Sequence, residues 1–112
     1  MIVEATSQQV RIQAHVWSPP TDIFEIENSY VVRVEIAGMH RQDFNIQLED
    51  NTLLIWGARR DKPERRAYHQ MEVRFGEFST LVAMPGPVVA DQVSAEYNDG
   101  FLTITLPRQE LE

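Results

Sequence analysis

The alternation of apolar and polar residues with a period of two constrains the fold of this chain more than any other feature. It is clearest in residues 93–108, where the turn signal Asn98-Asp99-Gly100 separates two alternating runs. Gly and Asn accept the positive φ that tight hairpin turns need. A period of two places one set of side chains on one face of a strand. We therefore predict a β-hairpin whose apolar faces are formed by Val93, Ala95, Tyr97, Leu102, Ile104 and Leu106.

The same period marks further short strands along the 112 residues of the chain. They are expected over residues 10–16, 21–26, 30–37, 44–48, 52–58, 68–73 and 78–84. Residues 52–58 are apolar on both faces, which is typical of a central strand. No pattern with a period of 3.6 residues persists long enough for a helix. The sequence thus predicts one all-β domain, an antiparallel β-sandwich of seven or more strands.

The charge of the chain is acidic and unevenly placed. The formal net charge is −7, which argues against nucleic acid as a partner because phosphate binding needs a basic surface. Residues 59–66 carry five basic and two acidic side chains, so this segment has a net charge of +3 and the rest of the chain −10. No apolar run is long enough to span a bilayer, so no membrane partner is expected.

No catalytic, cofactor or metal site is expected either. The three histidines, His15, His40 and His69, are scattered and have no carboxylates at ligand spacing. The chain has no cysteine and no phosphate-binding loop motif, and its serines lie outside a nucleophile-elbow context. We therefore do not expect an enzyme. The lack of cysteine and of a secretory signal pattern at the N-terminus fits a cytoplasmic protein.

Residues 95–102, A-E-Y-N-D-G-F-L, resemble the A-x-x-x-N-G-V-L signature of the small heat-shock proteins, the α-crystallin domain family. Three further matches follow in the order of that family. Residues 20–25 resemble its opening strand, and Ile-Ala-Gly at 36–38 resembles its aliphatic-[PA]-G bend. Residues 76–85 resemble its G-x-F-x-R-x-F-x-L-P strand. Together the four matches cover residues 17–108.

The resemblance implies an immunoglobulin-like sandwich, the α-crystallin domain, over residues 17–108. A short N-terminal arm, residues 1–16, would precede it, and a very short or truncated tail, residues 109–112, would follow. The resemblance also implies an ATP-independent holdase that binds unfolded or partly folded client proteins and prevents their aggregation. The alternative is a structural module that binds one specific folded partner, as CS-domain co-chaperones do.

The resemblance further implies a homodimer of the bacterial and plant type, because residues 57–76 leave room for a long loop whose strand swaps onto the partner. The dimer interface would consist of Ile23, Phe24, Tyr68, His69, Gln70, Met71, Glu72 and Val73. The basic charges of the loop either meet acidic residues of the partner or stay solvated. We expect solvation to dominate, since exposed ion pairs stabilise by only about 0–1 kcal/mol each. Tyr68 and Met71 would then contribute more through apolar burial.

Members of this family also dock a tail, or a client, in a groove between two strands. In this chain the groove would be lined by Ile46, Leu48, Val93, Ala95 and Tyr97. Two sandwich edges that do not close leave apolar side chains for a partner peptide to cover. From the residues alone, it stays open whether these side chains line a groove or belong to the core.

The sequence departs from the family pattern at three places. Thr80 stands where the family has an Arg, and Val82 where an aromatic residue follows it. Glu72-Val73 stands where the family has Glu-Arg. Residues 109–112 lack the Ile-x-Ile motif of the family's tail. We therefore expect this chain to form dimers more readily than large shells. Assembly into a higher oligomer is the alternative.

Overall fold

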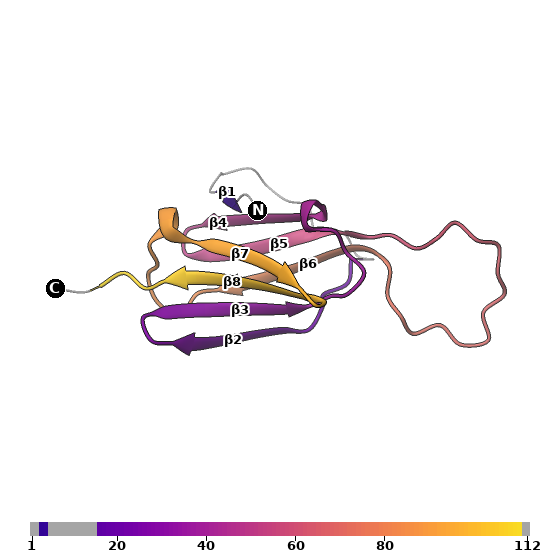
Figure 1. The fold of residues 1–112 in the computed structure, drawn as a ribbon, viewed down its shortest axis with the longest axis horizontal. Helices are drawn as coiled ribbons and strands as arrows, with labels where there is room; N and C mark the ends of the chain where they lie inside the picture. The colour runs from indigo at the N-terminus through magenta and orange to yellow at the C-terminus, as the bar shows by residue number, and fades with distance from the viewer. Residues whose placement is uncertain (1–2, 5–15, 111–112) are drawn as a thin grey trace.

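The alternating segments form two four-stranded sheets that pack face to face in the computed structural model, which describes residues 3–4 and 16–110 (Figure 1). One sheet has the order β1–β4–β5–β6, and the other has the order β2–β3–β8–β7. The first contains β1 (Val3–Glu4), β4 (Phe44–Glu49), β5 (Thr52–Arg59) and β6 (Gly76–Ala83). The second contains β2 (Thr21–Ile26), β3 (Ser29–Glu35), β7 (Ser94–Asn98) and β8 (Phe101–Pro107).

The predicted all-β sandwich is confirmed. Apart from strands, the described residues contain only two short 3₁₀ helices, η1 (Arg41–Asp43) and η2 (Ala90–Gln92). The predicted strand over residues 10–16 lies outside the described residues except for Val16. No helix within the described part of the chain is long and apolar enough to cross a membrane.

The turn between β7 and β8 lies where the sequence predicts it, and a second tight turn joins β4 to β5. Asp99 and Gly100 join β7 to β8 with φ of 52° and 83°, and Asp50 and Asn51 join β4 to β5 with φ of 49° and 61°. Two successive residues with positive φ match the right-handed twist of the strands they connect. Glu27 and Asn28 form the β2–β3 turn, since Ile26 already pairs with Ser29.

The core lies between the inner faces of the two sheets. β5 is central, as predicted, because it pairs with β4 on one side and β6 on the other. Burial of each large aliphatic side chain stabilises the fold by about 1.5–3 kcal/mol. The fully buried side chains alternate along the strands as the sequence indicates: Val32, Val34, Ile46, Leu53, Ile55, Phe78, Leu102, Ile104 and Leu106.

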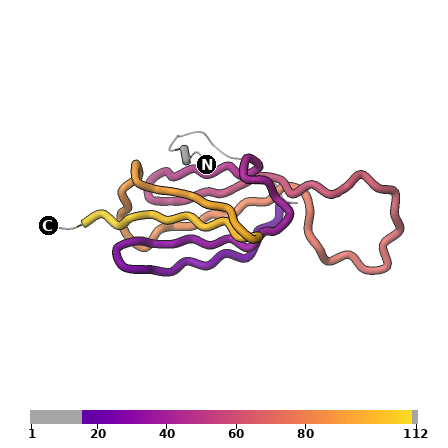
Figure 2. The backbone as a smooth tube through the Cα atoms, in the orientation of Figure 1, coloured from indigo at the N-terminus to yellow at the C-terminus, as the bar shows by residue number. Residues whose placement is uncertain are grey.

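A long loop, residues 60–75, leaves the sandwich between β5 and β6. Its two ends meet at the pair formed by Arg59 and Gly76. The loop carries no strand or helix, and it projects beyond one end of the sandwich (Figure 2). The strand predicted over residues 68–73 therefore has no pairing partner in the part of the chain that the structure describes. Loops of this length without secondary structure are uncommon and are usually functional.

Candidate functional site

The first part of the candidate site is the open edge of β2. Among the described residues this strand pairs only with β3, and Phe24 lies opposite Val31. Glu35 donates its backbone N–H to the Pro20 carbonyl. Because antiparallel ladders alternate between hydrogen-bonded and non-hydrogen-bonded pairs, this bond sets which β2 amides face β3. The N–H groups of Ile23 and Glu25 consequently point away from the sheet, where another strand can bind them.

The side chains of β2 combine apolar and charged groups. Ile23 is 45% exposed, and Arg33 of the adjacent strand lies over the Phe24 ring at 5.0 Å from its centroid. Arg33 also forms an ion pair with Asp22 at 2.9 Å, and Glu25 lies 3.5 Å from the guanidinium of Arg108. The edge thus presents free backbone donors together with exposed apolar surface.

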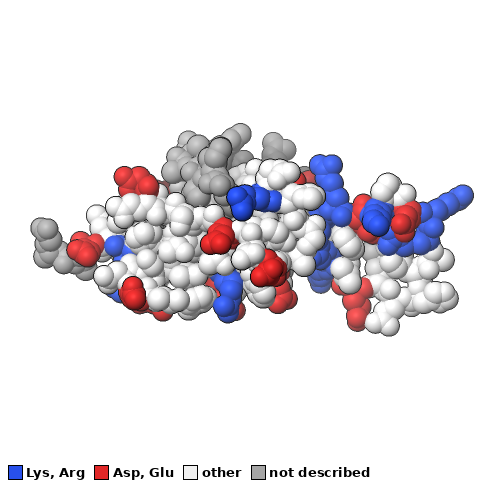
Figure 3. Space-filling view, in the orientation of Figure 1, with Lys and Arg blue, Asp and Glu red and all other residues white. Residues whose placement is uncertain are grey.

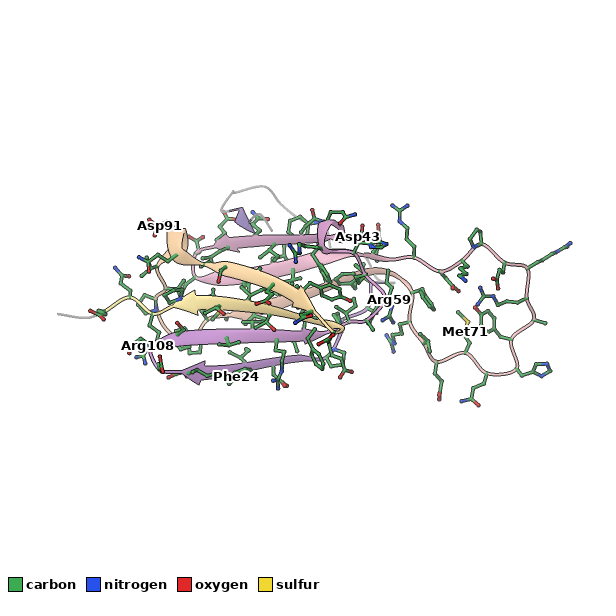
Figure 4. The ribbon with its side chains drawn as sticks, in the orientation of Figure 1. Phe24, Asp43, Arg59, Met71, Asp91 and Arg108 are labelled. Carbon is green, nitrogen blue, oxygen red and sulfur yellow. The ribbon has the colours of Figure 1, made fainter. Side chains whose placement is uncertain are left out.

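The second part of the candidate site is the segment 68–73 of the loop. Tyr68, Met71 and Val73 are 49%, 66% and 65% exposed, which is unusual for large apolar side chains. His69, Gln70 and Glu72 between them are also exposed, and the Gln70 amide donates to the Glu72 carboxylate at 3.0 Å. Phe24 on β2 and Met71 on the loop lie far apart (Figure 4). One chain therefore does not bring the predicted swapped strand and its receiving edge together.

Several basic side chains gather on this loop together with acidic ones, and the visible face of the sandwich carries scattered acidic and basic side chains (Figure 3). Arg66 lies 3.4 Å from Asp61 and 3.3 Å from Glu64, and its guanidinium donates to the Tyr68 hydroxyl at 3.2 Å. These contacts are local and exposed, so each stabilises only weakly. They do, however, connect the Tyr68 hydroxyl to Arg66 and Asp61 in the charged part of the loop.

The third part of the candidate site lies between β4 and β7, which belong to different sheets. The structure places Ile46 and Leu48 in the core, with 2% and 5% of their surfaces exposed. The other three predicted groove residues, Val93, Ala95 and Tyr97, are half-buried and pack against the core. The apolar row along β7 therefore lies at the margin of the core, whereas the two β4 residues lie inside it.

Tyr97 makes contacts that its position in the alternating pattern did not reveal. Its ring packs on Phe44 with a centroid distance of 5.0 Å. Its hydroxyl donates to the Ile36 carbonyl at 2.7 Å and accepts the Met39 N–H at 3.3 Å. Tyr97 thus links β7 to the connection between β3 and β4, and so joins the two sheets.

The edge of β4 carries a short strand that no pattern in the sequence predicts. Val3 and Glu4 of β1 pair in parallel with Ile46 and Gln47. Two residues give too short an alternation to be distinguished from a loop, so no sequence signal could have found this pairing. The pairing demonstrates that the β4 edge accepts an extended segment of this chain.

The structure accounts for the departures from the family pattern at Thr80 and Val82. Thr80 is buried, and its hydroxyl oxygen lies 3.3 Å from that of Thr21 on the opposite sheet. Val82 is buried in the core. Val73, in contrast, is exposed on the loop, and no contact within one chain explains why Val stands at this position.

Comparisons with known proteins agree with the geometry. The model of the Hsp20/alpha crystallin family matches residues 22–112. The chain is 32% identical over 94 residues to small heat shock protein C2 of Rickettsia felis, an alignment that covers 82% of this chain. That alignment spans 61% of the Rickettsia protein, so the chain corresponds to less than two thirds of the length of this curated relative.

Solved structures are similar across most of the chain. Heat shock protein 16.0 from Schizosaccharomyces pombe has 30% sequence identity and a TM-score of 0.74, with 83% of this chain and 88% of that one covered. HspA from Xanthomonas axonopodis has 28% identity and a TM-score of 0.76, with 83% and 95% covered. The sandwich described above is therefore the fold of these proteins.

Proposed function

The chain belongs to the Hsp20/alpha crystallin family, and we propose that it acts as an ATP-independent holdase that binds partly unfolded proteins and prevents their aggregation. The names of its relatives as heat shock proteins support this proposal. The observation that carries it is the β4 edge, where an extended segment, Val3–Glu4, already adds to the sheet. Unfolded chains offer the same extended backbone and apolar side chains.

We propose that clients bind between β4 and β7, at the margin of the core. The half-buried row of Val93, Ala95 and Tyr97 offers apolar contacts there. The β4 edge, which β1 covers at Ile46 and Gln47, offers its backbone hydrogen bonds to a client that displaces β1. Strand addition takes its affinity from the main chain and its specificity from alternate side chains. A site of this kind accepts many sequences, as a holdase requires.

We further propose that two chains form a homodimer in which residues 68–73 of each loop pair with the open edge of β2 of the other. The free N–H groups of Ile23 and Glu25 would then gain partners, and Tyr68, Met71 and Val73 would be covered. The basic loop and the acidic edge residues Asp22 and Glu25 are complementary in charge. Such complementarity favours encounter and correct register more than it adds affinity.

Heat-induced aggregation of several unrelated proteins tests the holdase proposal. Light scattering is followed without ATP, with and without the chain, and with an equal mass of an unrelated protein as a control. We expect the chain to suppress scattering of every client. Protection of none would refute the holdase, and protection of a single protein would favour a module with one specific partner.

A matched pair of variants locates the client site. Val93→Lys places a charge in the half-buried row, whereas Ser94→Lys places the same charge on the exposed face next to it. We expect Val93→Lys to protect clients less than Ser94→Lys at equal concentration, once urea unfolding shows that both are folded. Equal protection by the two variants would exclude this row as the client site.

A further inference from the structure

The guanidinium group of Arg59 joins separate parts of the chain at the root of the loop 60–75. Arg59 ends β5 and pairs with Gly76, so both ends of the loop meet beside it. Its Nε and Nη2 donate to the Arg74 carbonyl, with the Nε bond at 2.9 Å. Its Nη1 donates to the Ala37 carbonyl at 3.3 Å. The returning end of the loop is thereby anchored to the bend that follows β3.

Two aromatic rings flank the same group. The centroids of the Trp17 and Phe75 rings lie 4.8 Å and 5.2 Å from Cζ of Arg59. Trp17 forms an isolated β-bridge with Phe78 of β6, whereas Phe75 is the last residue of the loop. Arg59 therefore connects loop and sandwich by ring contacts as well as by hydrogen bonds, at the point where the loop leaves the sandwich (Figure 4).

A loop of this length without secondary structure can leave the sandwich in many directions. Ordering it costs conformational entropy when its middle segment binds another chain. We propose that Arg59 is a positioning residue for dimerisation, which fixes the direction of the loop before the partner binds. This inference rests on the proposed strand-swapped dimer and names the residue that prepares the loop for it.

The chemistry of the Arg59 guanidinium favours positioning of the loop over a simple effect of its charge. A planar guanidinium donates in several fixed directions while its faces stack on rings, whereas a lysine ammonium is a compact charge. Arg59→Lys therefore keeps the positive charge but removes the planar group whose donors and faces make these contacts. Arg60→Lys is the matched control, because Arg60 is the exposed neighbour at the start of the loop.

Sedimentation equilibrium of the full chain gives the dimer dissociation constant of each variant. We expect Arg59→Lys to raise it at least tenfold over the wild-type value, and Arg60→Lys to leave it within twofold. Thermal unfolding of both variants establishes that they are folded. Equal dissociation constants for the two variants would overturn the inference.

A second measurement reads the direction of the loop itself and not the dissociation constant. The chain has no cysteine, so spin labels on His69→Cys and Asp91→Cys report the distance from loop to sandwich. Labelled chains are diluted in unlabelled ones so that only intrachain distances are read. We expect Arg59→Lys, and not Arg60→Lys, to broaden the distance distribution. A wild-type monomer would refute the dimer proposal alone, whereas unchanged distributions would refute the role of Arg59.

Discussion

The hydroxyl of Tyr97 donates a 2.7 Å hydrogen bond to the carbonyl of Ile36, and this bond ties the β7 edge to the connection that leads into β4. The same oxygen accepts the N–H of Met39. One phenol group therefore satisfies two backbone groups and holds the two strands that border the proposed client site. Buried polar groups that lose such partners destabilise a fold.

We expect Tyr97→Phe to lower the free energy of unfolding by about 1–2 kcal/mol, because the Ile36 carbonyl and the Met39 N–H lose their partner. Urea unfolding measures the change. Tyr68→Phe is the control, since the Tyr68 hydroxyl binds only exposed loop groups, and its effect should stay within about 0.5 kcal/mol. Equal effects of the two variants would contradict the role of Tyr97.

The open edge of β2 can be blocked with one residue. Ile23→Pro removes an N–H that points away from β3, so the β2–β3 ladder is kept while strand addition is prevented. Ile23→Ala removes most of the side chain and keeps the N–H. We expect light scattering to give the mass of a monomer for Ile23→Pro and of a dimer for Ile23→Ala. A dimeric Ile23→Pro would exclude pairing along this edge.

Deletion of residues 60–73 removes the proposed swapped strand. Arg74 and Phe75 then connect β5 to β6, and replacement of residues 60–75 by Asn-Gly gives a second variant with a favourable two-residue turn. Because the core residues are untouched, we expect both variants to fold and to be monomeric by light scattering. A folded variant of unchanged dimer mass would refute the strand swap.

The hydroxyl pair between Thr21 and Thr80 predicts an asymmetric response to substitution. Thr21 gives its hydrogen to the Pro19 carbonyl at 2.9 Å, so Thr80 must donate to Thr21. Thr21→Val leaves the buried Thr80 hydroxyl without an acceptor and should cost about 1–3 kcal/mol. Thr80→Val leaves Thr21 bound to Pro19 and should cost less than about 1 kcal/mol. The opposite order in urea unfolding would contradict this donor assignment.

Removal of β1 should expose the β4 edge. Deletion of residues 1–4 takes away the strand that pairs with Ile46 and Gln47. We expect faster deuterium uptake in a peptide that covers residues 44–49. Uptake in β8 should not change, because that strand lies between β3 and β7. Unchanged uptake in β4 would mean that β1 does not protect this edge.

The strands and their turns were predictable because their signals are local. A period of two fixes which side chains of 102–106 share a face, and Asp50-Asn51 and Asp99-Gly100 specify tight turns in any context. The centrality of β5 followed from its apolar residues on both faces. Each of these inferences needs only neighbours in the chain.

The sites depend on contacts between distant segments, and the sequence could not supply them. A strand of two residues, β1, carries no pattern of its own, and the partners of Arg59 lie at positions 17, 37, 74 and 75. The donor of the Thr21–Thr80 pair follows only from the position of Pro19 in space. By itself the sequence determined the β-sandwich and its long loop, since alternation and turn chemistry act locally. Only the tertiary structure decided which edges stay open and which side chains hold the loop, because long-range packing sets both.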